Sequence, residues 1–255
     1  MSNLENVTPG SDHILILIHG ATINGRMWDA VRRHLNPSFR VLAPDLPGHG
    51  LRRDEIFTLE GAVETIVAAA KSEAPSPIVL AGDSLGGYTA MAAAAALPKN
   101  QLKGLVLGGC TANLSGLVLT PFLFKIAVFK IIFALFSEER FIQKRLPKML
   151  AAQGVDANDV HSMIEGGVSL RVFAAAVNAI RGIDFRARLA AIEQPVLIVN
   201  GSRDSTFIKQ EADFLAVAQH ASSHRFDNCE HGVSILRSAE FAGLVNSFAE
   251  RVFAG

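Results

Sequence analysis

The segment that most constrains this fold is an apolar run that ends abruptly at a serine between two glycines. Residues Ile78 to Ala81 are aliphatic or small, Gly82-Asp83-Ser84-Leu85-Gly86 follows, and an Ala-rich segment continues to Leu97. Aliphatic and β-branched runs favour a buried strand, whereas Ala and Leu favour a helix. The pattern therefore predicts a strand, a sharp turn and a helix, with the serine on the turn.

The glycine spacing at this turn points to chemistry. Gly82-x-Ser84-x-Gly86 is the spacing of a nucleophile elbow, in which a strand-to-helix turn lifts a serine hydroxyl above a sheet. Small residues are needed on either side because the turn is strained and tightly packed. The following helix also directs its unpaired N–H groups toward whatever the serine attacks. A turn of a Rossmann-like sheet without chemistry is the alternative.

The rest of the chain alternates between strand and helix patterns. Predicted strands cover residues 13–18, 39–43, 78–81, 102–107, 195–200 and 223–226, and predicted helices cover 27–35, 58–72, 184–192, 207–219 and 233–252. Such alternation is typical of an α/β fold with a doubly wound sheet. We expect about six strands, mostly parallel, because the 12 residues before the first strand leave little room for a further hairpin.

The alternation breaks between Cys110 and Arg181, where the apolar segments have helical character and no strand pattern is convincing. Because the alternation then resumes, we expect residues 112–181 to be a helical cap inserted into a core of residues 1–111 and 182–255.

The most apolar part of this insertion extends from Leu117 to Phe136 and contains Pro121. Its helical part, from Phe122 onward, is shorter than the about 20 residues that a membrane span needs, so we expect no transmembrane span. It is apolar nearly all round, and we therefore expect it to be covered on more than one side.

Charge is balanced over the whole chain but not in the insertion. The chain has 24 Lys and Arg against 24 Asp and Glu, which does not favour nucleic acid as a partner. In residues 114–153, however, basic residues outnumber acidic ones. A solvated face is one interpretation, and contact with an anionic membrane surface or an acyl carrier is the other. The basic residues are Lys125, Lys130, Arg140, Lys144, Arg145 and Lys148, and the acidic ones are Glu138 and Glu139.

Cysteine and histidine usage bears on cofactors and location. Cys110 and Cys229 have no paired spacing, and no Cys/His cluster has the spacing of a metal site, so we expect neither a disulfide framework nor a metal. The first 12 residues are polar and lack the pattern of a secretion signal, so we expect a cytoplasmic location. Nothing in the sequence predicts the oligomeric state.

Together these motifs make the chain similar to the α/β-hydrolase superfamily, and in particular to its small, capped, cofactor-independent esterase-like members. The matching residues are His19-Gly20 with Trp28, the loop Asp45–Gly50, the elbow at Ser84, then Asp204 and His231. The order serine, acid, histidine is the one that this fold uses. The resemblance implies an α/β-hydrolase fold and a serine hydrolase without a cofactor.

A serine hydroxyl needs a base to become a nucleophile, and the base needs a carboxylate to orient it. His231 follows the last predicted strand and Asp204 the one before it, so both lie at the carboxyl edge of the sheet, where ligands bind. Asp227 and Glu230 lie too near His231 in sequence to approach its ring well. The predicted catalytic residues are therefore Ser84, Asp204 and His231.

The resemblance also implies an oxyanion hole and a substrate pocket. The fold supplies the backbone N–H after the nucleophile, here Leu85, and one from the loop after the first strand, here Ala21. Asp83 precedes the turn apex, so a nucleophilic aspartate of the dehalogenase kind is disfavoured. The residues predicted to contact substrate are Gly20, Thr22, Phe122 and Phe129.

The favoured function is hydrolysis of a small carboxylic ester with an apolar acyl or alcohol group, through an acyl-enzyme on Ser84. A carbon–carbon bond hydrolase, a thioesterase or a hydroxynitrile-lyase-like enzyme would use the same three residues. A ligand-binding receptor on the hydrolase fold, and a non-enzymatic membrane-surface protein, are alternatives of other classes.

Overall fold

A six-stranded parallel sheet forms the centre of the molecule in the computed structural model, which describes residues 12–254. The strand order is β2-β1-β3-β4-β5-β6, and every neighbouring pair is parallel, as predicted. The expectation that the first 12 residues carry no secretion signal concerns residues that lie almost entirely outside the described range. The strands are β1 (Ile14–Ile18), β2 (Arg40–Leu42), β3 (Ile78–Asp83), β4 (Leu102–Gly108), β5 (Val196–Gly201) and β6 (Ala221–Phe226).

Both faces of the sheet are covered, and β1 shows how the sequence achieves this. Ile14, Ile16 and Ile18 belong to one apolar cluster, whereas Leu15 and Leu17 belong to the other. Successive side chains of a strand point to opposite faces, so a run of five apolar residues fits a strand buried on both sides. The strand is almost completely inaccessible to solvent.

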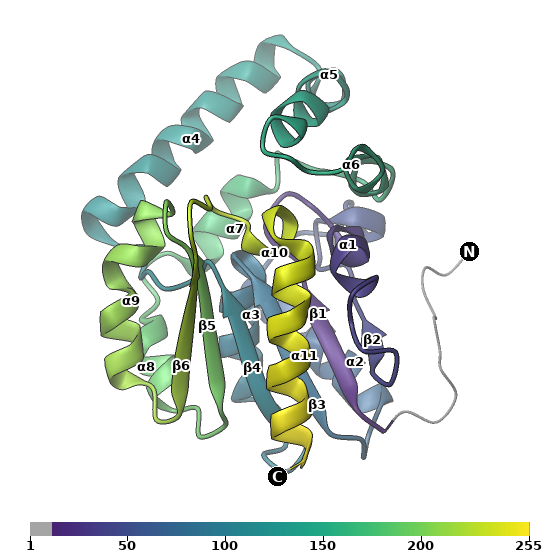
Figure 1. The fold of residues 1–255 in the computed structure, drawn as a ribbon. Coiled ribbons are helices and arrows are strands. Elements are labelled where there is room, and N and C mark those ends of the chain that lie inside the picture. Colours follow the sequence, from purple (N-terminus) through teal and green to yellow (C-terminus); the bar gives the residue numbers. More distant parts are fainter. Residues whose placement is uncertain (1–11, 255) are drawn as a thin grey trace.

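Helices from different parts of the chain cover the two faces (Figure 1). One apolar cluster contains residues of α2 (Leu59–Ser72), α3 (Leu85–Ala94), α8 (Phe185–Ala190) and α9 (Ser205–Val217). The other contains residues of the 3-10 helix η1 (Gly25–Trp28), α1 (Asp29–Arg32), α10 (Val233–Leu236) and α11 (Ser238–Ala254). A short 3-10 helix, η2 (Gly50–Arg52), lies between β2 and α2.

Two predicted helices differ from those observed. The helix expected at 27–35 is η1 followed by the single turn of α1, because the N–H groups of His34 and Leu35 bond three residues back rather than four. The closing helix expected at 233–252 is interrupted at Arg237, which leaves the helical region with φ −134° and ψ 45°. The interruption lets α10 stay at the carboxyl edge while α11 crosses the sheet.

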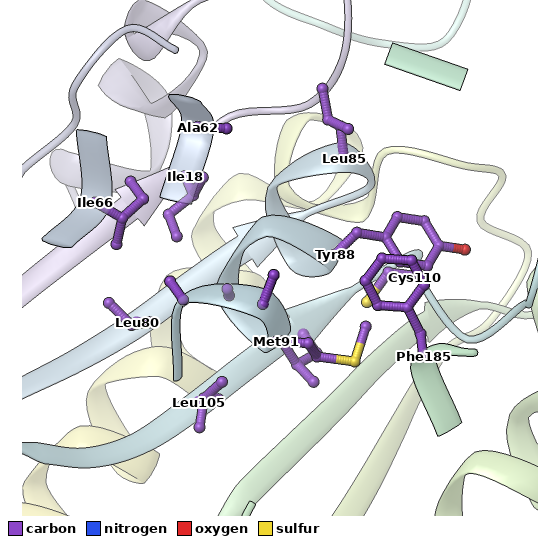
Figure 2. Close-up of a cluster of buried hydrophobic side chains, with 14 of the residues drawn as sticks. Ile18, Ala62, Ile66, Leu80, Leu85, Tyr88, Met91, Leu105, Cys110 and Phe185 are labelled. Atoms are coloured by element: carbon purple, nitrogen blue, oxygen red, sulfur yellow. The ribbon is translucent and has the colours of Figure 1, made fainter. Parts of the chain in front are cut away.

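The turn between β3 and α3 is held by close backbone packing. A side chain on Gly86 would collide with the carbonyl oxygen of Ile18, and one on Gly87 would collide with the sulfur of Cys110. Figure 2 shows the apolar cluster beneath this turn, where Tyr88 of α3 packs against Phe185 with ring centroids 4.6 Å apart. The glycines therefore let α3 lie directly on β1 and β4.

Four helices separate β4 from α8 in sequence: α4 (Gly116–Leu135), α5 (Glu138–Ala151), α6 (Ala157–Glu165) and α7 (Phe173–Ile180). In Figure 1, α4, α5 and α6 lie beyond the carboxyl edge of the sheet. Asn24 joins this region to the loop after β1, because its side-chain amide donates to the carbonyl of Met163, 2.8 Å away. The division into a core and a cap remains a prediction.

Helix α4 differs from both expectations for it. The helix is 20 residues long and includes Pro121 without a break, so the argument that its helical part is too short for a membrane span is wrong. Only Phe133 is buried, so the expectation of cover on more than one side is wrong as well. Within residues 12–254, α4 is the one helix long and apolar enough to span a bilayer, a test of length and composition that is weak by itself.

Candidate active site

Three side chains that lie far apart in the sequence meet at the carboxyl edge of the sheet. Ser84 Oγ lies 2.9 Å from Nε2 of His231, and Nδ1 of the same ring lies 2.6 Å from Oδ2 of Asp204. Ser84, Asp204 and His231 follow β3, β5 and β6, and parallel strands end at a common edge. The three side chains thus form one chain of hydrogen bonds.

The backbone of Ser84 is held in an uncommon conformation. Its φ is 56° and its ψ is −118°, in a region that residues other than glycine rarely occupy. Its N–H donates to the carbonyl of Gly108, 2.7 Å away, and its own carbonyl accepts from the N–H of Gly87 at 3.0 Å. These two bonds tie the turn to β4 on one side and to α3 on the other. The hydroxyl of Ser84 does not cap α3 and points toward His231.

The two predicted oxyanion donors belong to segments that adjoin the serine, and their role remains a prediction. Leu85 is the first residue of α3, where backbone N–H groups have no acceptor within the helix. Ala21 follows Gly20, and a side chain on Gly20 would stand 3.6 Å from Cβ of Ser84. The loop after β1 therefore passes directly beside the serine.

A buried histidine shapes this loop. The Nδ1–H of His19 donates to the carbonyl of Gly20 at 2.8 Å, and its Nε2 accepts from the N–H of Leu46 at 3.0 Å. Burial lowers the pKa of His19 to about 4, so the imidazole is neutral near pH 7 and its two nitrogens keep these distinct roles. His49 lies 4.8 Å away, ring to ring, and burial together with the His19 charge lowers its pKa to about 3.

The electrostatics of His231 suit a base. Loss of solvent lowers the pKa of its ring, but the hydrogen bond and charge of Asp204 and the charge of Asp83 raise it by more. The net effect is a pKa above the usual 6.5. The side chain of Asp204 is 7% exposed, whereas that of His231 is 41% exposed, so the imidazole remains open to a reactant.

Two groups beside His231 were not predicted from the sequence. The ring of Phe207 stacks on that of His231, with centroids 4.9 Å apart and planes 19° from parallel. Asp83 is 1% exposed and accepts hydrogen bonds from the N–H and hydroxyl of Ser234, three residues after His231. Phe207 lies one turn after Asp204 on α9, and that spacing was the available signal.

The four predicted substrate contacts fall into two places. Gly20 and Thr22 lie on the loop after β1, where Thr22 has a φ of 73° and its carbonyl accepts from the N–H of Ser169 at 2.9 Å. Phe122 and Phe129 lie on α4 and both contact Phe173 of α7, with ring centroids 6.5 and 5.8 Å away. Contact of these four residues with a substrate remains a prediction.

A hollow of about 140 Å³ lies between α4 and α7, and its lining combines apolar side chains such as Phe129, Phe133 and Leu170 with Lys130 and Arg171. Within residues 12–254, no three His, Cys, Asp or Glu side chains gather closely enough to hold a metal ion.

A parallel sheet that carries a serine, a histidine and an acid on its carboxyl-edge loops, in that arrangement, is typical of hydrolases with a nucleophile elbow. Comparison with known proteins agrees, because residues 15–244 match the sequence profile of the Alpha/beta hydrolase family. The chain belongs to this family, and it is an enzyme of the α/β-hydrolase type.

The relatives have hydrolytic names. The chain is 28% identical over 245 residues to the pimeloyl-[acyl-carrier protein] methyl ester esterase of Neisseria meningitidis, covering 92% of this chain and 93% of that protein. It is 35% identical to Lipase LipV of Mycobacterium tuberculosis over 106 residues, which is 41% of this chain and 40% of that one. MenH from S. aureus has a similar fold, with a TM-score of 0.75, 19% identity and coverage of 98% of this chain and 96% of that chain.

Proposed function

We propose that the protein hydrolyses a carboxylic ester through a covalent acyl-enzyme on Ser84. The observation that carries the proposal is the unbroken series of hydrogen bonds from Asp204 through His231 to Ser84. A serine, an imidazole and a carboxylate in this order are the groups that nucleophilic acyl transfer needs. The esterase and lipase names of the relatives support the ester as the bond that is cleaved.

In the first half of the proposed reaction, Ser84 Oγ attacks the ester carbonyl carbon while Nε2 of His231 takes its proton. The carbonyl oxygen becomes an oxyanion that accepts hydrogen bonds from the N–H groups of Leu85 and Ala21. Removal of one such donor costs about 2.7–4 kcal/mol in comparable sites. His231 then gives the proton to the leaving alcohol, and the acyl group stays on Ser84.

In the second half, water attacks the acyl carbon while His231 takes one of its protons. Collapse of the second tetrahedral intermediate releases the carboxylic acid, and the imidazolium returns the proton to Ser84. Throughout the reaction, Asp204 accepts a hydrogen bond from the Nδ1–H of His231, so that Nε2 of the same ring faces the serine. The charge of Asp204 also stabilises the imidazolium.

We infer an apolar substrate because aromatic rings gather on the inner side of α4. Phe122 and Phe129 both contact Phe173 of α7, and Phe129 also lines the hollow between α4 and α7. The partner that we propose is thus a small-molecule ester. Two free, buried cysteines, Cys110 and Cys229, support a reducing location such as the cytoplasm.

A panel of p-nitrophenyl esters with rising acyl chain length tests the proposal. We expect turnover with a preference for longer chains and a burst of nitrophenol that reveals the acyl-enzyme. Ser84→Ala should abolish both. Ligand binding without turnover would favour the receptor on a hydrolase fold, and cleavage of thioesters or carbon–carbon bonds in preference to esters would assign the same three residues to another reaction.

A further inference from the structure

One side of α4 presents large apolar side chains to water along the whole helix. Leu117, Phe124, Ile131 and Leu135 are 90%, 71%, 63% and 72% exposed. Their spacing of seven, seven and four residues places them on one side of a helix, and we call these four the outer row. Monomeric proteins rarely expose continuous apolar surface of this kind, and such surface marks a contact site.

The opposite side of α4 already holds the helix on the protein. Val118 and Phe122 pack against the main apolar cluster, while Phe129 and Phe133 contact rings of α7 and α5. The outer row is therefore not needed to attach the helix. Its side chains remain 63–90% exposed, and only 11% of the most apolar part of α4 is buried.

Basic residues outnumber acidic ones on α4, which carries the outer row, and on the next helix, α5. Helix α4 contains no acidic residue. Of the two acidic residues that begin α5, Glu138 is engaged by Arg171 at 2.9 Å. Five exposed basic residues of α4 and α5 form no ion pair within residues 12–254, namely Lys130, Arg140, Lys144, Arg145 and Lys148.

We propose that α4 and α5 dock onto the surface of an anionic lipid bilayer, with the outer row inserted among the lipid headgroups. A bilayer satisfies both features at once, because its acyl boundary accepts apolar side chains and its anionic headgroups attract lysine and arginine. An acidic carrier protein would match the cations but leave the outer row in water. A second copy of the chain would cover the outer row but bring two sets of cations together.

The helix would lie in the plane of the surface and would not cross it. Leu114 before α4 and Ile142 after it are both buried, 2% and 6% exposed, so both ends are anchored on the same folded body. Since α4 lies beyond the carboxyl edge of the sheet (Figure 1), docking would turn that edge toward the lipid. If the proposed ester hydrolysis is also correct, esters dissolved in the bilayer would reach Ser84 from the docked side.

Co-sedimentation of the full chain with lipid vesicles tests this docking. We expect binding to phosphatidylcholine vesicles that contain about 30% phosphatidylglycerol, and binding at least about tenfold weaker to phosphatidylcholine alone or at high salt. The double variant Phe124→Glu/Ile131→Glu should lose at least about tenfold in affinity for the anionic vesicles.

Matched variants separate docking from folding and from catalysis. Val217→Glu changes an exposed apolar residue at the far end of α9, at the opposite edge of the sheet, and should bind vesicles like the unmodified protein. The double variant should hydrolyse a water-soluble ester normally, and Ser84→Ala should bind vesicles normally. Lys144→Gln/Arg145→Gln should weaken binding to anionic vesicles while leaving binding to neutral vesicles unchanged.

Several results would overturn the docking proposal. They are failure of the unmodified protein to bind anionic vesicles, full binding by the double variant, or a dimer in solution that the double variant dissociates without any vesicle binding. Binding to an acyl carrier protein in place of vesicles would also overturn it. Loss of the proposed function appears separately, as ester turnover that survives Ser84→Ala.

Discussion

The turn that carries Ser84 and the helix α4 lie at the same edge of the sheet but are stabilised in different ways. Around the turn, neighbouring backbones touch, and the first nine residues of α3 are all buried. Along α4, a helix twice as long, one residue of 20 is buried. The chain therefore packs densely around the turn that carries the proposed nucleophile and leaves most of α4 uncovered, as the proposed approach of a substrate or a lipid surface would require.

The largest effect should come from removing the one oxygen on which the turn is centred. Ser84→Ala deletes the nucleophile without changing the backbone or the packing, so we expect kcat/KM for p-nitrophenyl esters to fall by more than about 10⁴-fold, with little change in Tm. Steady-state kinetics and thermal unfolding of the same preparation test this. Retention of activity would remove the serine from the mechanism.

Asp204→Asn should give the next largest loss, about 10³–10⁴-fold in kcat, because the amide no longer favours the required tautomer of His231. The pH profile adds an independent readout. In the unmodified enzyme, kcat/KM should fall below a pKa that lies above 6.5, where the imidazole becomes protonated. Loss of the carboxylate lowers that pKa, so the acid limb of the variant should move to lower pH. A limb that does not move would show that another carboxylate sets the pKa.

A pair of phenylalanine truncations compares the two regions directly in stability. Phe185→Ala removes a completely buried ring beneath the turn and should cost about 3–5 kcal/mol of unfolding free energy. Phe124→Ala removes a ring that is 71% exposed on α4 and should change it by less than about 0.5 kcal/mol. Urea denaturation measures both. A comparable loss for the two variants would mean that the outer row of α4 is covered in solution.

These contrasts also explain what could be predicted from the sequence. The sheet and the meeting of Ser84, Asp204 and His231 depend on local patterns and on the rule that parallel strands end at one edge, so order along the chain sufficed. The environment of α4 depends on what packs against it. Its apolar composition suggested burial, and Pro121 suggested that the helix would be interrupted. Proline has no N–H to donate to the carbonyl of Leu117, four residues earlier, but Leu117 is exposed and the helix continues without that bond.

The interruption at Arg237 could not be predicted for a similar reason. Nothing in the spacing of apolar residues from 233 to 252 marks the place where the chain turns back over the sheet.

Acid should weaken the dense region because it contains buried, neutral imidazoles. Burial lowers the pKa of His19 to about 4, whereas in the unfolded chain the pKa is near 6.5. Below pH 6.5 the unfolded state binds the additional proton, so unfolding free energy should decrease as pH falls toward 4, by about 3 kcal/mol for this residue. Urea denaturation at several pH values measures the slope. A flat profile between pH 6.5 and 4 would contradict a neutral, buried His19.

The smallest expected effect concerns the border between the two regions, where α4 meets α7. Phe129→Ala removes a ring that lines the hollow beside Phe173 and should enlarge it. If acyl chains bind there, KM for long p-nitrophenyl esters should change several-fold, which corresponds to about 1 kcal/mol, while the acetate ester is unaffected. Phe124→Ala is the matched control, because it removes the same side chain from the outer row of the same helix. Equal effects of the two variants on long esters would place the acyl chain elsewhere and leave the aromatic group of α4 and α7 as packing alone.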